Sequence, residues 1–96
     1  MSAQVIIYTT GYCPYCTRAK SLLSKKAVLF KEIDVSSRPD LRSWTRARTG
    51  QRTVPQVFVN GEALGGFTDI AALDQRGLLD SKLSREPAPG DPAMKF

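Results

Sequence analysis

"QVIIYTTGYCPYCTRAKSLL", residues 4–23, runs from an apolar segment into an amphipathic one and carries both cysteines of the chain. Residues 4–9 are apolar and β-branched, which is typical of a buried strand. Pro14 suits the first turn of a helix, where its missing N–H costs nothing. Beyond Cys16, apolar side chains fall on one helical face and basic ones mostly on the other. The stretch therefore predicts a strand followed by a helix that begins beside Cys13.

The next segment predicts a second strand and a second helix. Residues 28–35 alternate and are β-branched, which indicates a strand. A helix between two strands implies a right-handed unit with parallel strands. The helix predicted over residues 37–50 has Ser37 and Asp40 in a capping-box-like start and Gly50 as its stop.

The third segment predicts a hairpin and a closing helix. Residues 55–66 contain two short strand patterns that turn at Asn60-Gly61, a strong hairpin signal. A short helix capped by Thr68 or Asp69 follows, and residues 78–84 add a final helical turn. The predicted order is β-α-β-α-β-β-α, which is an α/β fold.

Length and composition limit the chain to one small domain. We place the domain at residues 1–86 and expect residues 87–96 to form a flexible, Pro-rich tail. No apolar run approaches the ~18–20 residues of a membrane span. The first residues lack the features of a secretory signal, so we expect no membrane association and a cytoplasmic location.

The formal net charge of +5 raises the question of an anionic partner. Much of it comes from the basic residues of "RPDLRSWTRART", residues 38–49. A solvated helix face accounts for such a run better than nucleic-acid binding does. A local site for a small anion is the third interpretation. We therefore predict no nucleic-acid partner.

The cysteine pair has three interpretations. Zinc takes about four Cys or His ligands, but this chain has two cysteines and no histidine, so only a site shared between two chains remains. A structural disulfide across so short a ring would add little stability. A redox centre fits best, because residues three apart at a helix start are close enough for a bond to form and break.

Position gives the two cysteines different roles. Cys13 is expected at the helix N-cap, exposed and facing unpaired backbone N–H groups. Cys16 is expected one turn into the helix and more buried. We therefore predict Cys13 as the nucleophilic thiolate and Cys16 as the resolving thiol, the thioredoxin-like pattern of a redox-active disulfide.

Three motifs together resemble the dithiol glutaredoxins: "CPYC" at 13–16, "TVPQVF" at 53–58 and "GGFTD" at 65–69. The resemblance covers about residues 4–84. It implies a thioredoxin-like fold, a four-stranded mixed sheet with helices on both faces. Pro55 matches the family's cis-proline, which would bring the Val54 backbone beside Cys13 to pair with glutathione like an added strand.

The resemblance also implies the rest of a glutathione site. Thr68 and Asp69 match the residues that hold the γ-glutamyl end, and Gly65 and Gly66 allow close backbone approach. Arg42 stands where relatives bind the glycyl carboxylate. The glutathione-binding residues implied by the resemblance are Tyr15, Arg42, Thr53, Val54, Pro55, Gly66, Thr68 and Asp69.

Two positions depart from the family pattern. Relatives usually carry a lysine where this chain has Thr10, so a cation that would favour the Cys13 thiolate is missing. Arg18 or Arg52 is a candidate substitute. Many relatives also carry a third cysteine where Phe67 stands.

The resemblance implies a monomeric, glutathione-dependent oxidoreductase that reduces protein disulfides and protein–glutathione mixed disulfides. Glutathione is the co-substrate, regenerated by glutathione reductase and NADPH, and no metal is required. Two other functions stay open. One is a protein of this shape reduced by thioredoxin reductase, and the other is a dimer that carries a glutathione-ligated iron–sulfur cluster through Cys13.

Overall fold

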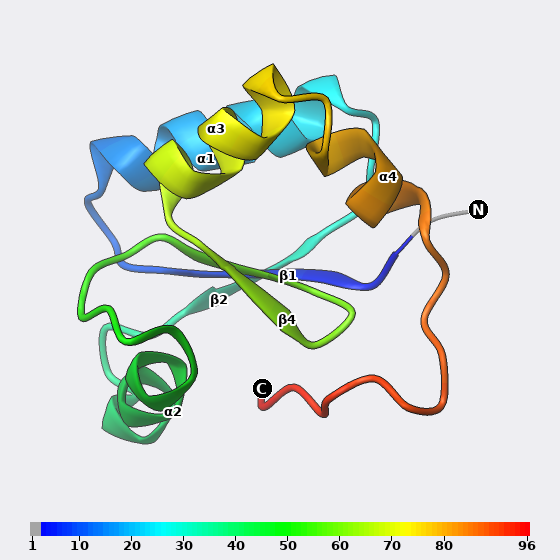
Figure 1. Cartoon of the computed structure of the whole chain (residues 1–96). Coiled ribbons are helices and arrows are strands. Elements are labelled where there is room, and N and C mark those ends of the chain that lie inside the picture. The colour runs from blue at the N-terminus through cyan, green and yellow to red at the C-terminus, as the bar shows by residue number, and fades with distance from the viewer. Residues whose placement is uncertain (1–2) are drawn as a thin grey trace.

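The computed structural model describes residues 3–96, so the first two residues of the predicted domain lie outside it. Figure 1 shows a central sheet with helices on both sides. The elements in chain order are β1 (Val5–Thr9), α1 (Pro14–Lys25), β2 (Lys31–Asp34), α2 (Pro39–Thr49), β3 (Gln56–Val59), β4 (Glu62–Gly65), α3 (Phe67–Gln75) and α4 (Leu79–Ser84).

The sheet is mixed, as predicted. Its strand order is β2-β1-β3-β4, with β1 parallel to β2 and antiparallel to β3. The hairpin between β3 and β4 turns at Asn60 and Gly61, which both have positive φ. The four-stranded thioredoxin-like architecture implied by the sequence is confirmed.

One face of the sheet packs against α1, α3 and α4 (Figure 1). Alternate residues of the strands point into this layer. The buried side chains here are all aliphatic, and we call them the aliphatic cluster: Ala3, Val5, Ile7, Ala19, Leu23, Val28, Val57, Val59, Leu64, Ile70, Leu79 and Leu83. Twelve such side chains form most of the core.

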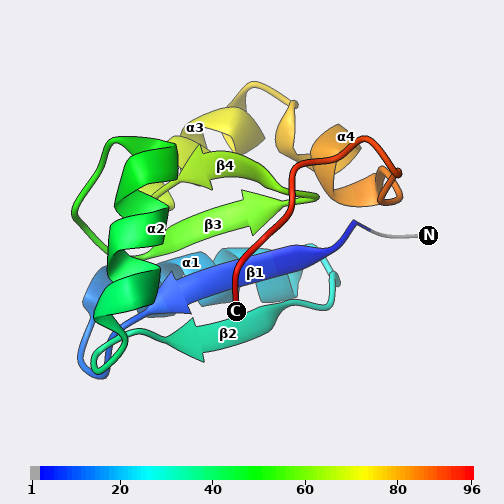
Figure 2. The same cartoon turned by 90° about the horizontal axis from the view of Figure 1, so that it is seen from below.

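The other face carries α2 and the C-terminal segment (Figure 2). Its buried side chains are Ile6, Tyr8, Val35, Leu41 and Phe58, which we call the aromatic cluster. The Trp44 ring stacks on Phe58 with centroids 5.0 Å apart, and Tyr8 meets Phe58 edge-on at 5.5 Å. Aromatic side chains thus fill the space under the single helix of this face.

The C-terminal segment lies across the aromatic face rather than away from the protein (Figure 2). Met94 packs against the aromatic cluster, and the Tyr8 hydroxyl donates to the Lys95 carbonyl. Gly61 passes so close to the Pro92 carbonyl that a Cβ there would overlap it. The flexibility predicted for residues 87–96 stays a prediction.

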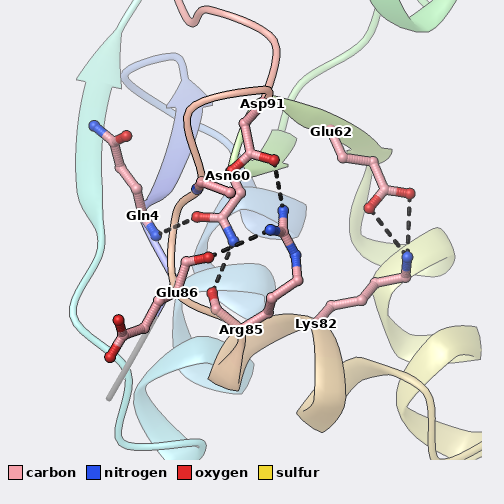
Figure 3. A network of polar contacts seen from close by, with 8 residues as sticks. Gln4, Asn60, Glu62, Lys82, Arg85, Glu86 and Asp91 are labelled. Carbon is pink, nitrogen blue, oxygen red and sulfur yellow. Dashed lines mark hydrogen bonds and ion pairs between the residues drawn. The ribbon is translucent and has the colours of Figure 1, made fainter.

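Polar contacts connect the hairpin turn to both ends of the chain (Figure 3). Buried Asn60 accepts from the Gln4 N–H and donates to the Arg85 carbonyl, each at 2.8 Å. The Arg85 guanidinium pairs with Asp91, within the C-terminal segment, at 3.0 Å. These contacts set the direction in which residues 87–96 leave α4.

Two predicted helix starts are wrong. Arg38, not Ser37, is the N-cap of α2, because Pro39 has the backbone geometry that a first helical residue needs. The N-cap of α3 is Gly66, because glycine is nearly as good a cap as serine and Asp69 reaches back to its N–H at 2.9 Å. The predicted stop of α2 at Gly50, which has a left-handed backbone, is confirmed.

Within residues 3–96 no helix has both the length and the apolar content that a membrane crossing requires.

Candidate active site

Cys13 lies at the start of α1, where β1 ends at the edge of the sheet. It is the N-cap of the helix, and its Sγ accepts from the Cys16 N–H at 3.1 Å. This N–H belongs to the set that a helix start leaves without backbone partners. In the reduced protein this amide would stabilise negative charge on the Cys13 sulfur.

The two cysteines have unequal access to solvent. Cys16 is 2% exposed, whereas Cys13 is half-buried at the surface end of the helix. Their Cα atoms are 5.1 Å apart and the structure joins them in a disulfide. Another molecule can therefore reach Cys13, whereas Cys16 is shielded from solvent.

The loop before β3 forms the second wall of the site. The Val54–Pro55 peptide bond is cis, as the resemblance implied. The Val54 carbonyl oxygen lies 3.8 Å from Cys13 Sγ. If the extended backbone of a cysteine-containing peptide paired with Val54, the sulfur of that peptide's cysteine would therefore lie next to Cys13.

The start of α3 forms the third wall. Asp69 Oδ2 accepts from the Gly66 N–H at 2.9 Å and from Gln51 Nε2 at 3.3 Å. A Cβ at Gly65 would overlap the Asp69 carboxylate, and Gly65 has φ of +99°. Glycine is therefore required at position 65. Neither bond uses Oδ1, so this oxygen can accept from an ammonium group.

A cavity of about 330 Å³ lies between Tyr15, the loop before β3 and the start of α3. Neither cysteine lines it, but it adjoins Cys13 through Val54, and we call it the thiol cavity. Seven of the eight predicted glutathione residues line it, all but Arg42. Its lining consists of Tyr15, Gln51, Thr53, Val54, Pro55, Gly66, Phe67, Thr68 and Asp69. Among the described residues, no cluster of three metal-ligating side chains is present.

Arg42 lies outside the thiol cavity. It lines a neighbouring cavity with Ser43, Arg46 and Arg52. The structure thus brings the predicted γ-glutamyl residues together with the cis-proline loop but separates Arg42 from them.

Aromatic and cationic side chains stack beside the cysteines. The Arg18 guanidinium lies 5.3 Å from the centre of the Tyr15 ring, and Tyr15 lies 6.3 Å from Phe67. Of the two arginines considered as substitutes for a lysine at Thr10, Arg18 therefore contacts Tyr15, and Arg52 lines the neighbouring cavity.

Sequence reasoning missed Gln51 and Gln56. Buried Gln56 donates to the Gln51 side-chain oxygen and to the Thr53 carbonyl, each at 2.9 Å. Gln51 in turn donates to Asp69, so two amides orient the carboxylate. Neither glutamine belongs to a recognisable motif, and the contact between Gln51 and Asp69 spans 18 residues of the chain. No local sequence pattern therefore indicated it.

Comparisons with known proteins agree on one family. The family model described as Glutaredoxin matches residues 5–64. A glutaredoxin of Pseudomonas aeruginosa is 46% identical over 80 residues, covering 83% of this chain and 95% of that protein. The solution structure of glutaredoxin from Brucella melitensis is 47% identical with a TM-score of 0.78, covering 86% of this chain and 90% of that one.

A second solved structure contains a ligand. The crystal structure of a buckwheat glutaredoxin–glutathione complex is 28% identical with a TM-score of 0.78. The match covers 84% of this chain and 76% of the buckwheat chain.

Proposed function

The chain belongs to the glutaredoxin family of glutathione-dependent thiol–disulfide oxidoreductases, and on this basis we propose that Cys13 is its nucleophile and Cys16 its resolving thiol. The observation that carries the assignment is the asymmetry of the pair. Cys13 is accessible and accepts the Cys16 N–H at 3.1 Å, whereas Cys16 is 2% exposed.

With a protein–glutathione mixed disulfide, one thiol is sufficient. The Cys13 thiolate attacks the glutathione sulfur, the protein sulfur leaves with the electron pair and takes up a proton, and Cys13 is glutathionylated. A glutathione thiolate then attacks the glutathione sulfur held on Cys13. Oxidised glutathione forms and the Cys13 thiolate is restored.

With a protein disulfide, both cysteines act. Cys13 attacks one sulfur and forms a mixed disulfide with the substrate, and the other substrate sulfur leaves as a thiolate. Cys16 loses its proton and attacks the Cys13 sulfur, which releases the second substrate thiol. The product is the Cys13–Cys16 disulfide, which two glutathione molecules reduce.

We propose that glutathione binds in the thiol cavity. Its cysteinyl backbone pairs with Val54 next to Cys13, supported by the 3.8 Å approach of the Val54 oxygen to the Cys13 sulfur. The N-terminal amides of α3 bind the γ-glutamyl carboxylate, and Asp69 Oδ1 accepts from the ammonium. Arg42 binds the glycyl carboxylate from the neighbouring cavity. The bound glutathione of the buckwheat relative supports this ligand.

A coupled assay tests the assignment. Glutathione, glutathione reductase, NADPH and a small glutathione mixed disulfide are supplied, and NADPH oxidation is followed. We expect Cys13→Ser to abolish turnover and Cys16→Ser, its matched control, to retain it. An inactive Cys16→Ser variant would contradict the one-thiol route. Faster turnover with thioredoxin reductase as the electron source would contradict dependence on glutathione.

We further propose that the protein acts as a monomer in the cytoplasm and that its reaction requires no metal. A protein that carries an iron–sulfur cluster absorbs visible light. Anaerobic purification, followed by an absorption spectrum and a measurement of molecular mass, tests the proposals on the monomer and on the metal together. A coloured dimer would contradict them.

A further inference from the structure

Three arginines line a single cavity beside α2. Arg42 and Arg46 are one helical turn apart on α2, and Arg52 comes from the loop that follows the helix. With Ser43 they enclose about 220 Å³, which we call the arginine cavity. Figure 2 shows α2 on the outer side of the sheet with this loop following it, and all four lining residues are exposed.

Their charges are not balanced within the described part of the chain. None of the six ion pairs there includes Arg42, Arg46 or Arg52, and the acidic residue in the first turn of α2, Asp40, pairs with Arg38 at 3.0 Å. Like charges one turn apart on a helix destabilise it. The arginine cavity is therefore suited to an anion from another molecule.

The arginine cavity borders the thiol cavity. Arg52 lies between Gln51 and Thr53 in sequence, and both of these neighbours line the thiol cavity. One loop thus forms part of each wall. A substrate that reacts at Cys13 can therefore extend from the thiol cavity into the arginine cavity.

Glutathione alone does not neutralise all three arginines of the arginine cavity. The proposed function assigns Arg42 to the glycyl carboxylate, which carries one negative charge. Arg46 and Arg52 remain, and two guanidinium groups bind a carboxylate with a planar pattern of donors.

We propose that Arg46 and Arg52 bind an aspartate or glutamate side chain of the protein substrate, close in sequence to the cysteine being reduced. This inference rests on the proposed function and specifies its substrate class. The occupant must bring a disulfide to Cys13, which an acidic protein segment does and a nucleic acid does not.

Two glutathionylated peptides test the inference. One carries aspartates within three residues of its cysteine, and the other carries asparagines at the same positions. At low ionic strength we expect kcat/KM of the wild-type protein to be about five- to tenfold higher for the aspartate peptide. Screening predicts that the preference falls as salt is added.

Variants locate the preference. Arg46→Glu should remove it, and Arg46→Gln should reduce it without adding an acid to the helix. Arg76→Glu is the matched control, because Arg76 is exposed at the end of α3, on the opposite face of the sheet. This variant has the same change in net charge and should keep the preference.

The outcomes separate this inference from the proposed function. Equal rates for the two peptides with the wild-type protein, or equal loss of preference in Arg46→Glu and Arg76→Glu, would overturn the acidic site. A second pattern of results would also overturn the acidic site. In that pattern, an added single-stranded oligonucleotide removes the preference equally from the wild type and Arg76→Glu, whereas Arg46→Gln keeps the preference. Turnover of a small glutathione mixed disulfide tests only the proposed function, and Arg76→Glu should leave that rate unchanged.

Discussion

The two faces of the sheet differ in what covers them. The α1, α3 and α4 face has twelve buried aliphatic side chains, whereas the α2 face has five, with aromatic rings among them and the C-terminal segment as part of its cover. The first face has a core enclosed by three helices. The second depends on a segment without helix or strand, and it presents an arginine cavity to solvent. Stability is therefore concentrated on one face, while the other has room for charged residues.

Truncating one buried leucine on each face tests most directly whether the two faces differ in their contribution to stability. Leu23 and Leu41 are both fully buried, Leu23 in the aliphatic cluster and Leu41 in the aromatic cluster. We expect Leu23→Ala to lower the free energy of unfolding by about 2–5 kcal/mol, and Leu41→Ala by less, because its cavity can collapse under one helix. Urea unfolding measures both. An equal or larger loss for Leu41→Ala would contradict the difference between the faces.

High pH should weaken the aromatic face through Tyr8. Burial raises the pKa of Tyr8 to about 12, above its ordinary value of 10.0. The unfolded chain then loses this proton first, so stability is intact below pH 10 and falls as the pH rises from 10 toward 12. One buried tyrosine with this shift predicts a loss of about 2–3 kcal/mol.

Unfolding followed across this pH range measures the effect, with Tyr8→Phe as the control. The variant should lack the Tyr8 contribution to the fall in stability. The same dependence on pH in both proteins would assign the loss to other groups.

Removing residues 87–96 measures what the C-terminal segment contributes to the aromatic face. We expect a loss of about 1–2 kcal/mol, because Met94 leaves the aromatic cluster and the Tyr8 hydroxyl loses the Lys95 carbonyl. Turnover of a small mixed disulfide should change less than about twofold, because no residue of the segment lines the thiol cavity. Thermal unfolding and the coupled assay check both. Unchanged stability would show that the segment does not support this face.

The proposed glutathione site allows the two faces to be compared by ligand binding, because its two ends are assigned to opposite faces of the sheet. Asp69 on α3 holds the Gly66 N–H, so it serves both the fold and the ligand. We expect Asp69→Ala to raise the KM for glutathione about five- to tenfold and to lower stability by about 1 kcal/mol. Asp69→Asn, which keeps an oxygen for Gly66, should recover the stability but not the KM. Full recovery of KM in Asp69→Asn would contradict a role for the carboxylate charge.

Arg42 on α2 should show the smallest effect. It is exposed and has no ion-pair partner among residues 3–96, so Arg42→Gln should leave stability within about 0.5 kcal/mol. The KM for glutathione should rise about two- to fivefold, because one exposed charge pair is lost. Steady-state kinetics at low ionic strength measures the change. An unchanged KM would remove Arg42 from the glutathione site.

Local rules predicted most of the fold. The apolar pattern of residues 4–9 and the turn at Asn60-Gly61 each depend on a few neighbouring residues, and both are confirmed. The predicted starts of α2 and α3 failed because several nearby residues can cap a helix, and small differences in backbone geometry choose between them.

The candidate site was predicted where one motif supplies the geometry. Cys13 and Cys16 are three residues apart, so their asymmetry follows from the direction of one helix. The Gln56–Gln51–Asp69 contacts and the arginine cavity join segments from different elements, and no local pattern encodes their meeting.

The sequence by itself determined the order of the elements, the family and the different roles proposed for Cys13 and Cys16, because each depends on residues that are close together in the chain. Only the tertiary structure decided that the segment ending at Phe96 covers the aromatic cluster and that Arg52 joins Arg42 and Arg46. The physical reason is distance along the chain. The Tyr8 hydroxyl meets a carbonyl 87 residues away, and such contacts are selected by packing rather than by local preference.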